Sequence, residues 1–245
     1  MKAVILAGGK GTRLKPYTTS LPKPLMPIGE RPVLELVLRQ LKRYGFTEIT
    51  LAVNHLSELI QAFFGDGSKW GVRICYSVED KPLSTIGPLK ILTDLPDTFL
   101  VMNGDVLTDL DLRGFWQSHK SSDAILSVAT TSRETRVDFG VINYDPDLGV
   151  TGFLEKPAYL NHVSMGVYLM DRRILDYIPD GRPFGFDDLM KTLIRKKAPV
   201  RVYPYTGFWL DIGRPEDYDQ ANTELLPTIN ELIGVQAVTG EENPN

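Results

Sequence analysis

The start of the chain holds the pattern that most restricts its fold, an apolar run that passes directly into a glycine-rich turn. Residues 2–7 (KAVILA) are long enough for one buried strand, and glycines follow at positions 8, 9 and 11. Apolar residues at helical spacing then predict a helix over 32–44, with Gly45 suited to its end. A strand, a sharp turn and a helix form the first part of the unit from which parallel sheets are built.

The same alternation continues through the first half of the chain. Further strands are predicted at 48–54, 72–78 and 99–102, and helices at 56–64 and 86–95. Because strands separated by helices favour parallel pairing, we predict an α/β protein with a Rossmann-like three-layer α/β/α arrangement. Its central sheet is expected to be mixed but mostly parallel.

The pattern changes after Asp105 and predicts a smaller second lobe. Asp111 suits the cap of a helix that ends near His119. We assign 1–233 to a single domain with halves at about 1–110 and about 111–215, and we expect 234–245, which has no apolar period, to be a flexible tail. The other predicted elements are strands at 124–130, 139–144, 149–155, 163–170 and 200–203, and helices at 171–178, 186–196 and 215–233, the last with a break at Pro227.

Composition excludes several classes of protein. The 245 residues carry a formal net charge of −4, which argues against a generally basic nucleic-acid-binding protein. No apolar run approaches the roughly 18 residues of a membrane-spanning helix and no signal-peptide pattern opens the chain, so a cytoplasmic location is expected. One cysteine, Cys75, and three scattered histidines argue against disulfide scaffolds and against Cys- or His-rich metal sites.

Charge is distributed unevenly, and the N-terminal segment is basic. Residues 1–45 contain nine Lys and Arg against two Glu, a balance of +7, so the rest of the chain carries −11. We interpret Arg39, Lys42 and Arg43 as a solvated helix face. Arg13 and Lys23 lie instead in glycine- and proline-rich sequence, which indicates a local anion site.

The segment 6–14 (LAGGKGTRL) is suited to binding phosphate. It follows the first strand, and in open α/β sheets ligands bind at the carboxyl ends of strands. Glycines let backbone N–H groups approach phosphate oxygens, and Arg13 can add a forked cationic contact. Prolines within 21–27 hold Lys23 on a stiff segment close to Arg13 in the sequence. The spacing matches neither G-x-G-x-x-G nor a Walker A loop, and a plain glycine-rich turn is the alternative.

Acidic residues at strand ends indicate a cation site. Asp105 and Asp211 each follow an apolar strand, and nucleotide-bound magnesium takes one or two carboxylates plus phosphate oxygens. Either Asp could instead cap a turn, although an unpaired carboxylate is costly in the apolar surroundings of Asp211. Glu155 and Lys156 offer a carboxylate for hydroxyl groups and a cation for a phosphate, which suits a sugar phosphate.

In this order, the motifs resemble those of the sugar-1-phosphate nucleotidyltransferases, the nucleoside-diphosphate-sugar pyrophosphorylases. The resemblance covers about 1–220 and implies that the smaller lobe binds sugar. Many relatives also carry a C-terminal β-helix, whose hexapeptide repeat is not visible here. The motifs are GGKGTRLKPYTTSLPKPLMP at 8–27, NGDVLTDLDL at 103–112, FGVI at 139–142, EKP at 155–157 and FWLDIGRPEDY at 208–218.

The resemblance implies that a nucleoside triphosphate and a sugar 1-phosphate react to give a nucleoside-diphosphate sugar and pyrophosphate. As catalytic residues, Arg13 would steady the leaving phosphates and Lys23 would bridge the triphosphate, while Asp105 and Asp211 would hold Mg²⁺. Neither nucleic acid nor a membrane is an expected partner, and a homo-oligomer is left open. The implied nucleotide-binding residues are Leu6, Ala7, Gly8, Gly9, Gly11, Thr12, Arg13, Lys23, Glu79, Pro82, Leu83, Ser84, Thr85, Asn103 and Gly104, and the implied sugar-phosphate-binding residues are Gly140, Glu155, Lys156 and Ser164.

The segment 79–89 (EDKPLSTIGPL) departs from the family pattern. Ser84 stands where the family usually has Gly, and Ile86 where it has Ala. If that Gly serves a positive φ, Ser84 is strained. Glu79 can accept from guanine N1–H and N2–H₂ together, which favours GTP. The sequence does not decide the sugar: a mannose- or heptose-type 1-phosphate is our preferred acceptor, and an amino sugar is left open. Glu79 as a solvated strand-end acid is the alternative to this role.

Two other functions are left open. The first is uridylyl or thymidylyl transfer to glucose 1-phosphate. The second, from another class, is a non-catalytic homologue that binds nucleotide-sugar and regulates a partner. The presence of Arg13, Lys23, Asp105 and Asp211 together favours the enzyme over the regulator.

Overall fold

A seven-stranded mixed sheet forms the centre of the molecule in the computed structural model, which describes residues 1–233. The predicted tail, 234–245, lies outside the described residues. The strand order is β12-β8-β11-β6-β1-β4-β5, and only β11 runs antiparallel to its neighbours. The mostly parallel sheet predicted from the sequence is therefore confirmed. The strands are β1 (Lys2–Leu6), β4 (Glu48–Val53), β5 (Arg73–Val78), β6 (Thr98–Asn103), β8 (Leu126–Arg136), β11 (Ala158–Asp171) and β12 (Val200–Tyr205).

Helices cover both faces of the sheet, as the three-layer prediction requires. Side chains of β1 alternate between two apolar cores, with Ile5 facing one and Val4 the other. The first core includes α1, α2, α3, α5 and α6, and the second includes α4. The helices are α1 (Val33–Arg43), α2 (Ser57–Phe64), α3 (Leu112–Lys120), α4 (Phe186–Arg195), α5 (Pro215–Thr223) and α6 (Leu226–Leu232). Among residues 1–233, no helix combines the length and apolar character that crossing a bilayer would need.

Helix boundaries follow local chemistry, with two departures from the sequence prediction. The Asp111 carboxylate accepts from Arg113 N at 3.0 Å and caps α3, as predicted. The predicted helix at 86–95 is only a 3₁₀ segment, Gly87–Ile91, because Gly87 N donates to Phe184 O. The predicted helix at 171–178 is likewise a 3₁₀ segment, Arg172–Tyr177. Between α5 and α6 the chain breaks as expected, and Pro227 lies in the first turn of α6.

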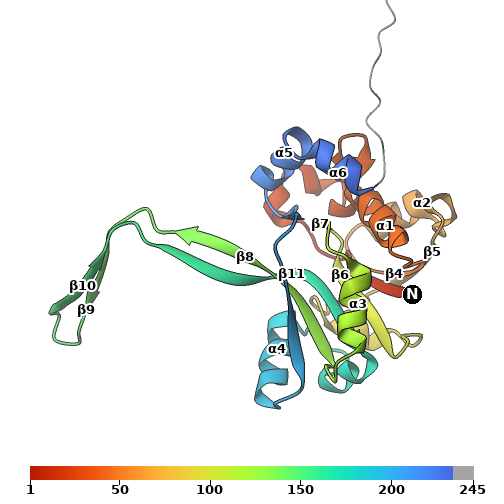
Figure 1. Ribbon diagram of the computed structural model, residues 1–245. Coiled ribbons are helices and arrows are strands. Elements are labelled where there is room, and N and C mark those ends of the chain that lie inside the picture. Colours follow the sequence, from red (N-terminus) through yellow and green to blue (C-terminus); the bar gives the residue numbers. More distant parts are fainter. Residues whose placement is uncertain (234–245) are drawn as a thin grey trace, which may run out of the picture.

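Two strands run well past their predicted ends and build an extension. Beyond Thr130 and Ser164, β8 and β11 leave the body as a two-stranded ribbon that ends in the hairpin of β9 (Val141–Tyr144) and β10 (Val150–Leu154) (Figure 1). We call residues 131–163 the arm and the rest of the described chain the body. The arm has no helix against it in Figure 1. Two shorter ladders complete the description: β2 (Pro27–Ile28) with β3 (Arg31–Pro32), and β7 (Val106–Thr108) with β13 (Trp209–Asp211).

Candidate active site

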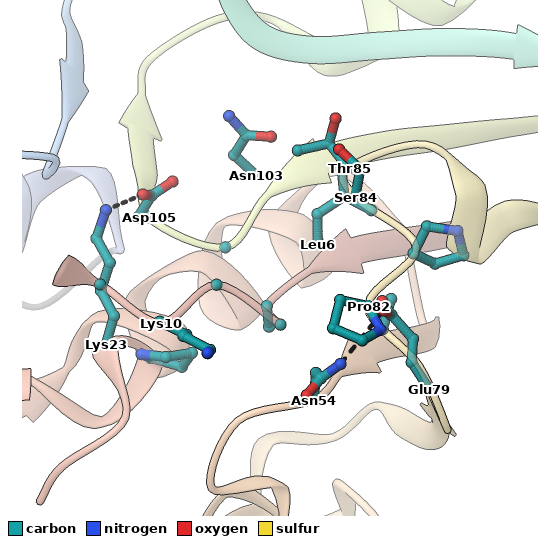
Figure 2. A pocket seen from close by; sticks show the side chains of 18 of the residues that line it. Leu6, Lys10, Lys23, Asn54, Glu79, Pro82, Ser84, Thr85, Asn103 and Asp105 are labelled. Atoms are coloured by element: carbon teal, nitrogen blue, oxygen red, sulfur yellow. Dashed lines mark hydrogen bonds and ion pairs between the residues drawn. The ribbon is translucent and has the colours of Figure 1, made fainter. Parts of the chain in front are cut away.

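A pocket of about 420 Å³ opens at the carboxyl ends of β1 and β6, where the α/β fold predicts a ligand (Figure 2). Nearly all of the implied nucleotide-binding residues line it. The exception is Leu83, which does not face the cavity. The predicted residues in its wall are Leu6, Ala7, Gly8, Gly9, Gly11, Thr12, Arg13, Lys23, Glu79, Pro82, Ser84, Thr85, Asn103, Gly104 and Asp105.

The glycine-rich loop is held open by its own local bonds. Gly11 has φ +59°, and a Cβ there would lie 2.8 Å from Thr18 Cγ2, so the position requires glycine. The Thr18 hydroxyl donates to Gly11 O at 2.7 Å and ties the loop to the following turn. Backbone atoms of Gly8, Gly9 and Gly11 therefore border the pocket without side chains in the way, as binding a phosphate needs.

Lys23 is fixed opposite this loop by an ion pair. Its ammonium donates to the carboxylate of Asp105, which follows β6, and both side chains are largely buried. The flanking Pro22 and Pro24 and a 3₁₀ segment, Lys23–Leu25, keep the lysine on a stiff part of the chain. The two charges were 82 residues apart in the sequence, and the sheet brings them into contact.

The β7–β13 ladder brings Asp211 to the same place. Asp211 pairs with Val106, and Ile212 N donates to Asp105 O at 3.0 Å, so the two aspartates lie side by side. Burial is the main cause that raises the pKa of the Asp211 carboxyl, and the negative charge of Asp105 raises it further. The positive charges of Lys23 and Arg13 lower this pKa. Asp211 is not in the pocket wall, although its neighbour Gly213 is. A cationic ligand beside the two carboxylates would remove this repulsion.

The loop 79–89 is fastened by bonds at both of its ends. The Glu79 carboxylate accepts from Leu83 N at 2.9 Å. It also accepts from Asn54 Nδ2 at 3.4 Å (Figure 2). Ser84 has φ +66°, so the residue that replaces the family's usual Gly is strained, as the sequence led us to expect. At the far end, Ile86 is completely buried in the second core. Glu79 therefore has a structural role in the loop in addition to any contact with a base.

The four implied sugar-phosphate residues are not gathered at the pocket, although Gly140 and Glu155 lie next to each other: a Cβ at Gly140 would lie 3.5 Å from Glu155 Oε2. Gly140, Glu155 and Lys156 lie on the arm and are not in the pocket wall. Ser164 lies at the base of the arm, where its hydroxyl donates to the Tyr168 hydroxyl at 3.1 Å. The sequence motifs predicted where these residues lie along the chain. They could not predict the direction in which the ribbon of β8 and β11 leaves the central sheet.

The pocket also contains residues that the sequence analysis missed. Lys10 lies inside the glycine-rich loop and adds a third cation beside Arg13 and Lys23. Asn54 follows β4, the strand next to β1, so the rule that ligands lie at carboxyl ends of strands could have found it. Pro24, Ala52, Pro88 and Gly213 complete the wall.

Comparisons with known proteins agree with this geometry. The profile of the family described as nucleotidyl transferase matches residues 2–228. The chain belongs to this family. Within the nucleotidyl transferase family, it is 36% identical over 264 residues to a UTP–glucose-1-phosphate uridylyltransferase of Synechocystis sp.. It is 33% identical over 227 residues to a mannose-1-phosphate guanyltransferase of Candida albicans.

These alignments cover most of the chain and less of each relative. They include 100% of the chain and 68% of the Synechocystis protein, and 89% of the chain and 62% of the Candida protein. Among solved structures, the chain is similar to HddC from Yersinia pseudotuberculosis complexed with GMP-PN. It superposes with a TM-score of 0.71 at 26% identity, covering 91% of this chain and 99% of that one. The predicted fold and family are thus confirmed.

Proposed function

We propose that this nucleotidyl transferase joins a nucleoside triphosphate to a sugar 1-phosphate, with release of pyrophosphate. The observation that carries the proposal is the pocket itself, in which an open glycine loop, Arg13, Lys23 and Asp105 surround one cavity. A cavity of about 420 Å³ is in the range of small-ligand sites. A phosphate oxygen of the sugar 1-phosphate attacks the α-phosphorus in line, and the bond to the bridging oxygen of pyrophosphate breaks.

Such a transfer depends on how the reacting groups are positioned and on neutralisation of phosphate charge, without a covalent intermediate on the protein. Loop N–H groups and Arg13 suit the β- and γ-phosphates, whose charge rises as they leave. Lys23 is held by Asp105 on the opposite wall, where it suits the α-phosphate. In this proposal the half at about 1–110 binds the nucleotide and the half at about 111–215 binds the sugar.

Asp105 and Asp211 fit a magnesium ion. Among residues 1–233, no group of three or more His, Cys, Asp or Glu side chains surrounds a common point, and Asp105 and Asp211 are two adjacent carboxylates at the pocket. That is the donor set of a magnesium ion that takes its other ligands from phosphates and water. The raised pKa of the Asp211 carboxyl, caused by burial and by Asp105, would be relieved by a cation. When bound, the ion would neutralise charge on the triphosphate.

GTP with a mannose- or heptose-type 1-phosphate is our preferred substrate pair. Glu79 in the pocket wall, the Candida relative and the complex of HddC with GMP-PN support guanine. The Synechocystis relative supports the alternative, uridylyl transfer to glucose 1-phosphate. The proposal includes a cytoplasmic location, which a single cysteine supports.

Pyrophosphate release over a substrate grid tests the proposal. The grid crosses GTP, UTP, dTTP, CTP and ATP with mannose, glucose, galactose, glucosamine and heptose 1-phosphates, each with and without magnesium. We expect one strong, metal-dependent combination. If no combination releases pyrophosphate but the protein binds a nucleotide-sugar measurably, the result would favour the non-catalytic regulator instead.

A further inference from the structure

The placement of Asp211 depends on a very short ladder. Asp211 is the last residue of β13 and Asp105 directly precedes β7, so the two carboxylates meet only if these strands pair in one register. The ladder lies outside the seven-stranded sheet and has three residue pairs, and two-stranded pairs are only marginally stable by themselves. A slip by one residue would turn the Asp211 side chain to the opposite face. The register therefore needs contacts beyond the ladder itself. The pairs are Thr108 with Trp209, Leu107 with Leu210, and Val106 with Asp211.

A buried hydroxyl holds the start of β13. Thr108, the last residue of β7, is completely buried, and its hydroxyl donates to Phe208 O at 2.7 Å. Phe208 directly precedes β13, and Asp109 N donates to the same carbonyl at 3.2 Å. The Thr108 hydroxyl also accepts from Leu110 N at 3.2 Å, so it is used both as a donor and as an acceptor. A shift of β13 along β7 would break the bond to Phe208 O and leave a buried hydroxyl without its acceptor, which is costly.

A glutamine on α1 holds the other strand of the ladder. Gln40 is 2% exposed, its side-chain Nε2 donates to Thr108 O, and α1 contacts β7. Its Oε1 accepts no hydrogen bond within the part of the chain that the structure describes. A leucine would fill this place without a half-used amide, so packing alone does not explain a glutamine here. The bond to Thr108 O explains it, because it ties β7 to a helix whose apolar side chains lie in the first core.

We propose that Thr108 and Gln40 are positioning residues for the carboxylates of Asp105 and Asp211. Neither lines the pocket, so both act through the ladder. Gln40 fixes the backbone of Thr108, and the Thr108 hydroxyl fixes Phe208. The register that results places Asp211 beside Asp105. Misplacement of a reacting group by about 1 Å can cost a hundredfold in rate. That the two carboxylates hold magnesium rests on the proposed function, whereas the hold on β13 does not.

Hydrogen exchange tests the hold on β13 without metal or substrate. In Thr108→Val a methyl group replaces the hydroxyl, and we expect the backbone amides of β13 to exchange at least about tenfold faster. Thr108→Ser keeps the hydroxyl and should restore most of the protection. Thr50→Val is the matched control, because Thr50 on β4 is also buried (3% exposed) but its hydroxyl has no hydrogen-bond partner within residues 1–233. This control should not change the exchange of β13.

Gln40→Met is a second variant, in case Thr108→Val fails to fold. Methionine is a flexible apolar side chain without a donor, so it removes the bond to Thr108 O and the half-used amide together. We expect the amides of β13 to exchange at least about threefold faster. Exchange of β13 that is equal in Thr108→Val, Gln40→Met and Thr50→Val would overturn the proposal. The ladder and the bond from Trp209 Nε1 to Met165 O would then be enough to hold the strand.

Metal binding tests whether the hold on β13 matters to the two carboxylates. Mn²⁺ alone is titrated against the full chain, and electron paramagnetic resonance measures the free ion. We expect Thr108→Val to bind Mn²⁺ at least about fivefold more weakly and Thr50→Val to bind it as the wild type does. The magnesium concentration for half-maximal release of pyrophosphate should rise by a similar factor in Thr108→Val, while turnover at saturating magnesium should change by less than about twofold. A merely structural role would instead lower turnover equally at every magnesium concentration.

The outcomes separate the positioning role from the proposed function. If β13 exchanges faster in Thr108→Val but the affinity for Mn²⁺ is unchanged, or if the wild type binds no Mn²⁺, Thr108 holds a strand and not a metal site, and the proposal is overturned. If the wild type released no pyrophosphate with any substrate pair, the proposed function would fail. Hydrogen exchange and the Mn²⁺ titration would still decide whether Thr108 and Gln40 keep the two carboxylates together.

Discussion

The body and the arm of this molecule differ in what determines their shape. In the body, Phe99 is completely buried between sheet and helices, whereas Phe153 in the arm is 59% exposed. Two apolar cores hold the strands of the body, but only the ladder of β8 and β11 holds the arm. Chemistry that depends on fixed charges is therefore concentrated in the body, and we expect the arm to adjust which sugar is accepted.

Removing one aromatic ring from each region gives the largest expected difference. Phe99→Ala should lower the free energy of unfolding by about 3–5 kcal/mol, because it leaves a cavity in the packed second core. Phe153→Ala should lower it by less than about 0.5 kcal/mol, as is usual for an exposed side chain. Urea titration at several protein concentrations measures both.

Equal losses for the two variants at low protein concentration would contradict the division into a packed body and an unpacked arm. A small loss for Phe99→Ala would mean that the second core tolerates a cavity. Circular dichroism of both variants provides the control that each still folds.

Asp211→Asn should separate activity from stability within the body. We expect turnover to fall at least about a hundredfold, since a neutral amide neither holds magnesium nor balances Arg13 and Lys23. Pyrophosphate release at saturating magnesium measures the loss. The variant should fold normally, and turnover close to that of the wild type would remove Asp211 from the mechanism.

The same substitution should stabilise the metal-free protein in a pH-dependent way. Burial and Asp105 raise the pKa of Asp211 in the folded state, so ionising it costs stability. The advantage of Asp211→Asn should be complete above the raised pKa and should disappear as pH falls below the ordinary value of 3.8. Thermal melting from acid to neutral pH, without magnesium, measures this trend. A wild-type protein that is more stable than the variant at neutral pH would contradict it.

The sequence predicted the body better than the arm, for physical reasons. The strand and loop at 2–14 and the helix cap at Asp111 could be predicted, because residues close together in the sequence determine these features. The contact of Asp105 with Asp211 depends on β7 and β13, which are about a hundred residues apart, and spacing cannot show that they pair. The strands of the arm were predicted, but a two-stranded ribbon contains no periodicity that reports its direction. Ser84 was informative because it stands where the family usually has Gly, and the structure shows a φ of +66° there.

Glu79→Gln should show whether the body alone chooses the nucleotide. A glutamine oxygen can still accept from Leu83 N, so the loop should keep its shape, whereas an amide cannot accept two guanine donors as a carboxylate does. We expect the preference for GTP over UTP and dTTP in kcat/KM to fall about tenfold. Glu79→Ala is the comparison that also loses the loop contact. An unchanged preference in both variants would leave Glu79 with only its structural role.

The smallest expected effects compare two strained residues, one in each region. Ser84 in the body and Leu148 at the hairpin turn of the arm both have φ +66°, and glycine at either position should relieve about 1 kcal/mol of local strain. Greater freedom of the unfolded chain offsets part of this gain. Ser84 lines the pocket within a loop fastened to the second core, so Ser84→Gly should raise the global unfolding free energy slightly and change KM for the nucleotide. Leu148→Gly should change neither, because the hairpin can open without the body unfolding. Hydrogen exchange should instead show slower opening of β9 and β10 alone. A global gain from Leu148→Gly equal to that from Ser84→Gly would mean that arm and body unfold as one unit.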